Sequence, residues 1–171
     1  MNKLILFCVE TTPQANTDYL YIKGTIKRFY EENNKIVMRP VFLKSKTRYK
    51  DRAVVNKIEG QTRNFPNEDV TVIYCIDVDD YDTSADTKKL LDEIKSYCIS
   101  NRYEFVFFCR DVEDVYWGKR VNKSEKIRMA ASFNEKHQIN SIKESQLRRI
   151  RYIKNSSNIL SILDKYLTKK R

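Results

Sequence analysis

The feature that most constrains the fold of this chain is a set of four short apolar segments separated by stretches with helical periodicity. The segments are rich in β-branched and aromatic residues, which is typical of buried strands. They cover residues 3–9, 35–43, 70–76 and 103–109. Because strand and helix alternate along the chain, the sequence predicts an α/β fold with a mostly parallel, four-stranded sheet flanked by helices on both faces.

The chain has two parts that differ in their predicted structure. At 171 residues it is about the size of one domain. Residues 1–114 hold the four strands and form the α/β core, whereas residues 115–171 show only helical patterns and form a basic extension packed on the same domain. The predicted helices cover residues 16–32, 53–58, 83–100, 124–133, 141–153 and 157–167. The second is broken near Gly60 and Pro66. The candidate N-caps of the last four are Thr83 or Ser84, Ser124, Ser141 and Ser157.

The net charge of +10 is concentrated in the C-terminal part. Residues 1–114 hold 18 Lys and Arg against 19 Asp and Glu, whereas residues 115–171 hold 15 against 4, a balance of +11. A localised basic surface favours a polyanionic partner, most often nucleic acid. The alternative is a solvated basic face that keeps the protein soluble.

Several classes of protein have no support in the sequence. The longest apolar run, Leu4–Val9, is much shorter than the roughly 20 residues of a membrane-spanning helix, so we expect no membrane association. There is neither a Gly-x-x-x-x-Gly-Lys phosphate loop nor a Gly-x-Gly-x-x-Gly motif to support nucleotide hydrolysis or dinucleotide redox chemistry. The scattered cysteines lack a Cys-x-x-Cys pair, which favours buried, reduced thiols in a cytoplasmic protein. They are Cys8, Cys75, Cys98 and Cys109.

Acidic side chains follow two of the predicted strands at the points where the strands end. Glu10 comes directly after the first strand, and Asp77 and Asp79 follow the third. The carboxyl ends of parallel strands meet at one edge of a sheet, where ligands collect, so we expect these side chains to lie together. Carboxylates this close repel one another unless a cation joins them or some bind protons. The sequence therefore predicts a site for Mg²⁺ or Mn²⁺ at this edge.

The Glu after the first strand and the Asp-x-Asp after a later strand resemble the Toprim domain. The opening Leu-Ile-Leu-Phe-Cys-Val-Glu and the helical C-terminal part look most similar to the RloB-like and OLD-family nucleases of bacterial defence against phage. The resemblance covers about residues 3–110. It implies that Asp77 and Asp79 coordinate Mg²⁺ and that Glu10 acts as a general acid or base in phosphodiester cleavage. It also implies an ATPase or sensor subunit as a partner, and a homo-oligomer.

Basic residues in three segments are candidates for binding the backbone of DNA or RNA, because such charges supply affinity for phosphates. They are Lys44, Lys46, Arg48, Lys50 and Arg52, then Lys119, Arg120, Lys123, Lys126 and Arg128, and finally Arg148, Arg149, Arg151 and Lys154. The aromatic residues Tyr49, Tyr116 and Trp117 lie among these charges and either stack on bases or pack in the interior. The large area that Trp buries favours packing for Trp117.

Other residues near the strand ends have more than one interpretation. Glu113 and Asp114 either help to bind a second metal ion or lie in the first turn of a helix, where the helix dipole favours acidic side chains. Asp80 and Asp82 are expected to cap the following helix or to face solvent. Tyr81 is a candidate nucleophile only by analogy with topoisomerases.

The sequence leaves three kinds of function open. The first is a metal-dependent nuclease that acts on DNA or RNA in anti-phage defence. The second is a non-catalytic nucleic-acid-binding or assembly module with a degenerate site. It is suggested by Thr11, which stands where topoisomerase-type Toprim domains usually have Gly, and by the missing Gly after the acidic cluster. The third is a metal-dependent transferase, since Asp-x-Asp coordinates nucleotide-sugar phosphates in some glycosyltransferases.

Overall fold

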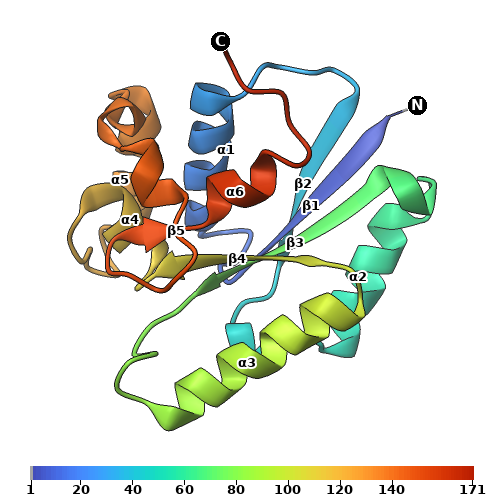
Figure 1. Cartoon of the computed structure of the whole chain (residues 1–171), viewed down its shortest axis with the longest axis horizontal. Coiled ribbons are helices and arrows are strands. Elements are labelled where there is room, and N and C mark those ends of the chain that lie inside the picture. Colours follow the sequence, from blue (N-terminus) through green and yellow to red (C-terminus); the bar gives the residue numbers. More distant parts are fainter. Residues whose placement is uncertain (1) are drawn as a thin grey trace.

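The computed structural model describes residues 2–171, except for the side chain of Asn134, and shows an α/β fold built on a five-stranded sheet (Figure 1). The strand order is β2-β1-β3-β4-β5. The strands are β1 (Lys3–Val9), β2 (Ile36–Phe42), β3 (Val70–Asp77), β4 (Glu104–Cys109) and β5 (Ser156–Ser157). The first four are parallel to one another, and β5 is antiparallel to β4. The mostly parallel sheet that the sequence predicts is therefore confirmed.

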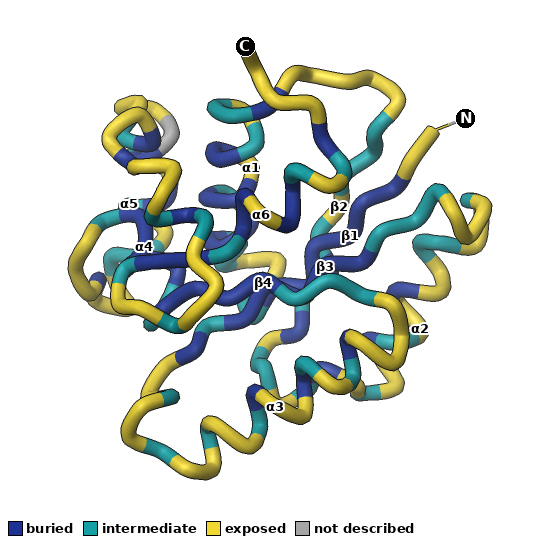
Figure 2. The backbone as a smooth tube through the Cα atoms, in the orientation of Figure 1, coloured by how far each residue is buried: buried dark blue, intermediate teal, exposed yellow. Residues whose placement is uncertain are grey.

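The apolar sequence of the central strands reflects burial on both faces of the sheet. Side chains alternate between the two faces along a strand. In β1, Phe7 and Val9 contribute to one hydrophobic cluster, whereas Leu6 and Cys8 contribute to the other. Figure 2 shows the same arrangement, with buried strands through the middle of the molecule and exposed residues on the outer sides of the helices.

Helices cover both faces of the sheet (Figure 1). The face that carries Phe7 packs against α1 (Thr17–Phe29), α4 (Val112–Trp117), α5 (Lys126–Glu135) and α6 (Ile159–Leu163). The face that carries Leu6 packs against α2 (Arg52–Thr62) and α3 (Ala85–Ser100). The 3-10 turns are η1 (Lys46–Arg48), η2 (Asn67–Asp69), η3 (Gln138–Ser141) and η4 (Glu144–Leu147).

The C-terminal part contains less helix than the sequence predicts. The predicted helix over residues 141–153 is wrong, because the chain forms only the short turn η4 and then a loop that returns to the sheet. In this loop the Arg149 N donates a hydrogen bond to the Ser157 O at 2.9 Å. Ile150 is 94% exposed, so this segment has no continuous apolar face to hold a helix against the core.

The edge strand β5 explains why the predicted number of four strands is wrong. Ser157 pairs with Phe108 and Ser156 pairs with Cys109, so β5 extends the sheet beyond β4. Ser157, expected as a helix cap, lies in this strand instead. Two serines have no apolar or β-branched signal that would identify a strand. The pairing depends on where the returning loop places them.

Two predictions at helix boundaries are confirmed. The Ser84 Oγ accepts a hydrogen bond from the Thr87 N at 3.2 Å, which confirms Ser84 as the N-cap of α3. The predicted break near Gly60 and Pro66 is confirmed, since α2 includes Gly60 and ends at Thr62, before Pro66. A glycine inside a helix costs only about 1 kcal/mol relative to alanine, which the packing of α2 on the sheet offsets.

Two findings bear on the environment that the sequence suggests. All four cysteines are free and buried, as predicted, and three of them lie in the apolar strands. Across residues 2–171, no helix combines the length and the apolar character needed to cross a membrane.

Candidate functional site

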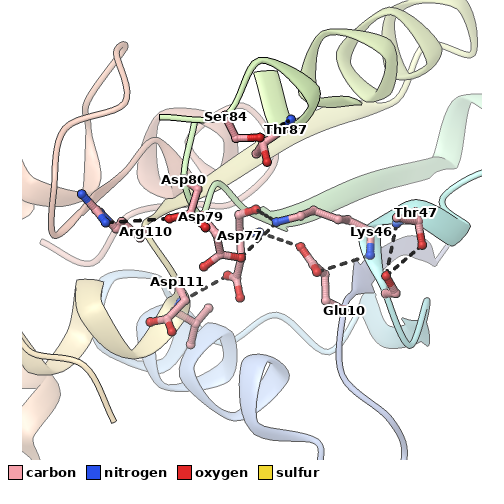
Figure 3. A network of polar contacts seen from close by, with 12 residues as sticks. Glu10, Lys46, Thr47, Asp77, Asp79, Asp80, Ser84, Thr87, Arg110 and Asp111 are labelled. Atoms are coloured by element: carbon pink, nitrogen blue, oxygen red, sulfur yellow. Dashed lines mark hydrogen bonds and ion pairs between the residues drawn. The ribbon is translucent and has the colours of Figure 1, made fainter. Parts of the chain in front are cut away.

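The predicted acidic residues meet at the carboxyl edge of the sheet. β1 and β3 are neighbours, and Val9 lies beside Cys75 in their register, so Glu10 and Asp77 emerge next to each other. The Glu10 Oε1 accepts a hydrogen bond from the Asp77 N at 2.8 Å. Asp79 follows two residues later, in the turn that leads to α3 (Figure 3). The structure thus brings Glu10, Asp77 and Asp79 together, as their positions at the strand ends predict.

Lys46 provides the positive charge within this group. Its Nζ donates hydrogen bonds to the Asp77 O at 2.8 Å and to the Asp79 Oδ2 at 3.0 Å (Figure 3). Its backbone N donates to the Glu10 Oε2 at 3.3 Å. We expected Lys46 only as a contact to nucleic acid, but the turn η1 after the edge strand β2 places it among the carboxylates.

Burial and mutual repulsion make the carboxylates hard to ionise. Burial raises the pKa of Glu10, although Lys46 and the Asp77 N act in the opposite direction. Burial raises the pKa of Asp77 well above its usual value, and the neighbouring Glu10 and Asp18 add to the effect. Burial alone would lower the pKa of Lys46, but Glu10 and Asp79 outweigh it and raise that pKa. The carboxylates therefore stabilise a nearby positive charge, and Lys46 alone does not neutralise all of them.

A second charged group lies beside the first, on the β4 side. It comprises Asp18 on α1, Asp111 and Glu113 after β4, and Lys126 at the start of α5. The Lys126 Nζ contacts the Glu113 Oε2 at 2.7 Å and the Asp111 Oδ2 at 3.5 Å. Among the described residues, the buried Glu113 Oε1 has no hydrogen-bond partner. Lys126, expected to bind nucleic acid, therefore neutralises carboxylates here.

Asp18 links the two charged groups. It is 5% exposed, and its Oδ1 accepts a hydrogen bond from the Thr17 Oγ1 at 3.3 Å. Burial, followed by repulsion from Glu113 and Glu10, raises the pKa of Asp18 to about 7. Nothing in the sequence marks Asp18, because it reads as an ordinary acidic residue in the first turn of a helix.

Asp111 connects the site to the end of β4. The adjacent Val112 N donates a hydrogen bond to the Asp77 Oδ1 at 3.2 Å. The Asp111 Oδ1 accepts a hydrogen bond from the Asp114 N at 2.8 Å and so caps α4. Glu113 and Asp114 lie in the first turn of that helix, as one of their two interpretations predicts. Asp111 itself was missed, although it follows a strand end just as Glu10 does.

The acidic side chains of the site are of the type that binds a hard divalent ion, but they are not arranged as a metal site. All are carboxylate oxygens, which Mg²⁺ prefers, and they outnumber the ammonium groups beside them. Within residues 2–171, however, no group of three or more Asp, Glu, His or Cys side chains is arranged to hold a metal ion. The Lys46 Nζ supplies the charge beside Asp79, whose side chain is 52% exposed.

The remaining acidic residues and Tyr81 lie at the margin of the site. Arg110 contacts Asp80 at 4.0 Å and Asp82 at 3.5 Å, and both carboxylates are largely exposed. The Tyr81 hydroxyl donates a hydrogen bond to the Tyr152 O at 2.8 Å, and the two rings pack edge to face. Tyr81 therefore holds the C-terminal loop against the core.

The candidate nucleic-acid contacts divide into exposed and engaged residues. Arg48 pairs with Asp51, Arg128 with Glu125, and Arg148 with Glu144 and Asp164. Arg128 is nevertheless exposed, and the exposed members of the set that form no ion pair among the described residues are Lys44, Lys50, Arg52, Lys119, Arg120, Lys123, Arg149, Arg151 and Lys154. These exposed residues are the ones available to a polyanion.

The aromatic residues among these charges pack in the interior. Tyr49 and Tyr116 are buried. The Trp117 Nε1 donates a hydrogen bond to the Tyr21 hydroxyl at 2.8 Å, and its ring packs against Phe133. The packing predicted for Trp117 is confirmed, and none of the three presents a free ring for stacking on bases.

Comparisons with protein-family models, with curated proteins and with solved structures found no match for this chain.

Proposed function

We propose that this protein is a nuclease that uses Mg²⁺, or Mn²⁺, to cleave phosphodiester bonds in DNA or RNA. The observation that carries the proposal is the hydrogen-bonded pair of Glu10 and Asp77 at adjacent strand ends, both with raised pKa values. Together with Asp79, Asp18 and Asp111 they form an excess of carboxylates that favours a bound cation. The balance of +11 in residues 115–171 suits a polyanionic substrate.

Asp77 and Asp79 are the residues that would hold the ion. When bound, it would supply Lewis-acid chemistry, polarising a phosphate oxygen and neutralising the charge that develops on it. Because Asp79 is half-exposed, a metal ion can replace the Lys46 ammonium group at this carboxylate.

Glu10 is the residue suited to moving a proton. Burial raises the pKa of Glu10 above its usual value, and a raised pKa helps a carboxyl group to act as a general acid or base. Hydrogen bonds from the Asp77 N and the Lys46 N fix the orientation of its two oxygens. In the proposed reaction Glu10 takes a proton from the attacking water or gives one to the leaving oxygen, and Lys46 remains charged beside the phosphate.

The cellular role in this proposal rests on the Toprim resemblance. By that resemblance we place the protein in the cytoplasm as an effector of anti-phage defence, with a separate ATPase or sensor subunit and self-association as its interactions. The free, buried thiols suit a reducing compartment.

The test is a cleavage assay with isosteric variants. Labelled DNA and RNA are incubated with Mg²⁺, with Mn²⁺ or with EDTA, using the wild type, Glu10→Gln and Asp77→Asn. We expect Glu10→Gln to lose at least about 100-fold in rate, which is typical of a lost proton-transfer group. Asp77→Asn should lose a comparable factor, because it removes a charged ligand of the metal ion. Asp82→Asn is the matched control, since its carboxylate lies at the same edge but pairs with Arg110. Cleavage that persists in both site variants would rule out the proposed centre.

A second candidate is a non-catalytic nucleic-acid-binding module. The contact of Lys46 with Asp79 and the Asp77 O favours it, because an internal lysine can neutralise the site without a metal ion. In the same assay this function predicts salt-sensitive binding, no cleavage by the wild type, and no effect of Mg²⁺.

A further inference from the structure

A hollow on the β4 side of the carboxylate edge is formed by the loop between α4 and α5. It has a volume of about 370 Å³ and is lined by Asp111, Arg120, Val121, Asn122, Lys123 and Lys126. The chain turns into this loop at Gly118, whose φ of +68° suits a residue without a Cβ. The loop returns toward the start of α4 and places its basic side chains around the hollow.

The charges around this hollow are mostly positive and only partly engaged. Among the lining residues, Arg120, Lys123 and Lys126 oppose the single carboxylate of Asp111, and Arg120 also lies within electrostatic reach of Asp114. Lys126 is fixed by its contacts with Glu113 and Asp111. Within residues 2–171, neither Arg120 nor Lys123 forms an ion pair, and both are exposed. The hollow thus combines one anchored cation with two available ones, which suits an anion with several oxygens.

The hollow adjoins the candidate catalytic edge through two residues. Asp111 lines it, and the next residue, Val112, donates its N–H to the Asp77 Oδ1. Figure 3 shows Asp111 near Asp77, on the other side of the carboxylates from Lys46. An anion in the hollow would therefore lie next to a phosphate at Asp77.

We propose that this hollow binds a backbone phosphate of a polynucleotide, next to the phosphate that is cleaved. The inference rests on the proposed function and deepens it, because a substrate that fills both places must carry at least two phosphates along one strand. Successive phosphates of a strand are spaced by roughly 3.4 Å of helix axis, so a single strand offers charges at close intervals. The preferred substrate is then an oligonucleotide rather than a single phosphodiester.

Binding without metal tests the hollow independently of cleavage. A fluorescein-labelled single-stranded oligonucleotide is titrated in EDTA with the wild type, the double variant Arg120→Ala/Lys123→Ala and the control Lys3→Ala/Lys35→Ala. The control removes the same charge from exposed residues at the opposite, amino edge of the sheet. We expect the first double variant to bind about tenfold more weakly, as for the loss of one charge-assisted contact. Its slope of log affinity against log salt should fall by about 1. Equal affinity of the two double variants would overturn the proposal.

Two further arms identify the ligand and the reaction. Excess inorganic phosphate should displace the oligonucleotide only weakly if the hollow recognises a phosphate within a chain, and full displacement would assign the hollow to free phosphate instead. With Mg²⁺, Arg120→Ala/Lys123→Ala should raise KM for the oligonucleotide about tenfold. The KM for bis(4-nitrophenyl) phosphate, which has one phosphate, should stay unchanged. If the double variant binds more weakly but the wild type cleaves nothing, the proposed nuclease activity is refuted and phosphate binding in the hollow is supported. If the double variant cleaves the oligonucleotide with an unchanged KM, the nuclease activity is supported and phosphate binding in the hollow is refuted.

Discussion

The two lysines of the site, Lys46 and Lys126, neutralise carboxylates in contrasting surroundings. Lys126 contacts Glu113, which is 1% exposed, whereas Lys46 contacts Asp79, which is 52% exposed. Breaking a buried ion pair leaves an uncompensated charge in the interior, while an exposed pair contributes at most about 1 kcal/mol. The difference indicates that the Lys126 side supports the fold and that the Lys46 side is the part able to exchange partners.

The elements that carry the two lysines fit this division. Lys126 begins α5, which packs against α1 in the larger hydrophobic cluster. Lys46 lies on η1, a single turn that follows the edge strand β2 and has no buried residue of its own. A helix held by core contacts keeps its side chains in place, whereas a short turn at an edge moves at lower cost.

Lys126→Met should have the largest effect on stability. The substitution leaves Glu113 buried without its cation, so we expect the free energy of unfolding to fall by about 3 kcal/mol. Urea unfolding measures the loss, with the exposed Lys136→Met as the matched control. Adding Glu113→Gln should recover part of it, because the uncompensated charge is then removed. If Lys126→Met unfolds like the control, Lys126 has no supporting role and the contrast with Lys46 disappears.

Asp18→Asn should have the next largest effect, and this effect depends on pH. Because the pKa of Asp18 is raised from 3.8 to about 7, the folded state binds its proton more tightly than the unfolded state does. Asp18 therefore supports stability below about pH 4, and this support is lost as the pH rises to about 7. One pKa unit corresponds to about 1.4 kcal/mol, so with relaxation around the charge we expect Asn to stabilise the protein by about 2 kcal/mol at pH 8.

The measurement for Asp18 is the free energy of unfolding at pH 5 and at pH 8. The difference between Asp18→Asn and the wild type should grow over this interval and stay constant at higher pH. Asp86→Asn, an exposed acidic residue in the first turn of α3, should show no such trend. Combining Asp18→Asn with Glu113→Gln measures how much of the repulsion of Asp18 comes from Glu113. A pH-independent difference would show that Asp18 is ionised at pH 5.

The difference between residues placed by the sheet and residues placed by helix packing explains which parts of the site the sequence could predict. Glu10 and Asp77 follow long apolar runs, and parallel pairing brings strand ends together whatever the loops do. Asp18 and Lys126 come together only through the packing of α1 and α5 on the sheet, which no local pattern encodes. Likewise, Ser156 and Ser157 become a strand because the loop after η4 returns to β4. The sequence thus predicts what the sheet positions, and tertiary packing decides the rest.

Lys46→Met should have the smallest effect on stability and a clear effect on metal binding. Only one partner of this pair is exposed, since Asp79 is 52% exposed and Lys46 15%, so we expect the free energy of unfolding to fall by about 1 kcal/mol. Removing the ammonium group frees the Asp79 oxygen, and the affinity for Mg²⁺ measured by calorimetry should rise about tenfold. Lys44→Met is the control, because it removes an exposed charge two residues away. Unchanged Mg²⁺ affinity together with a loss of stability like that of Lys126→Met would mean that both lysines are structural. The site would then be a closed ion-pair network, and the non-catalytic module would become the better account of the protein.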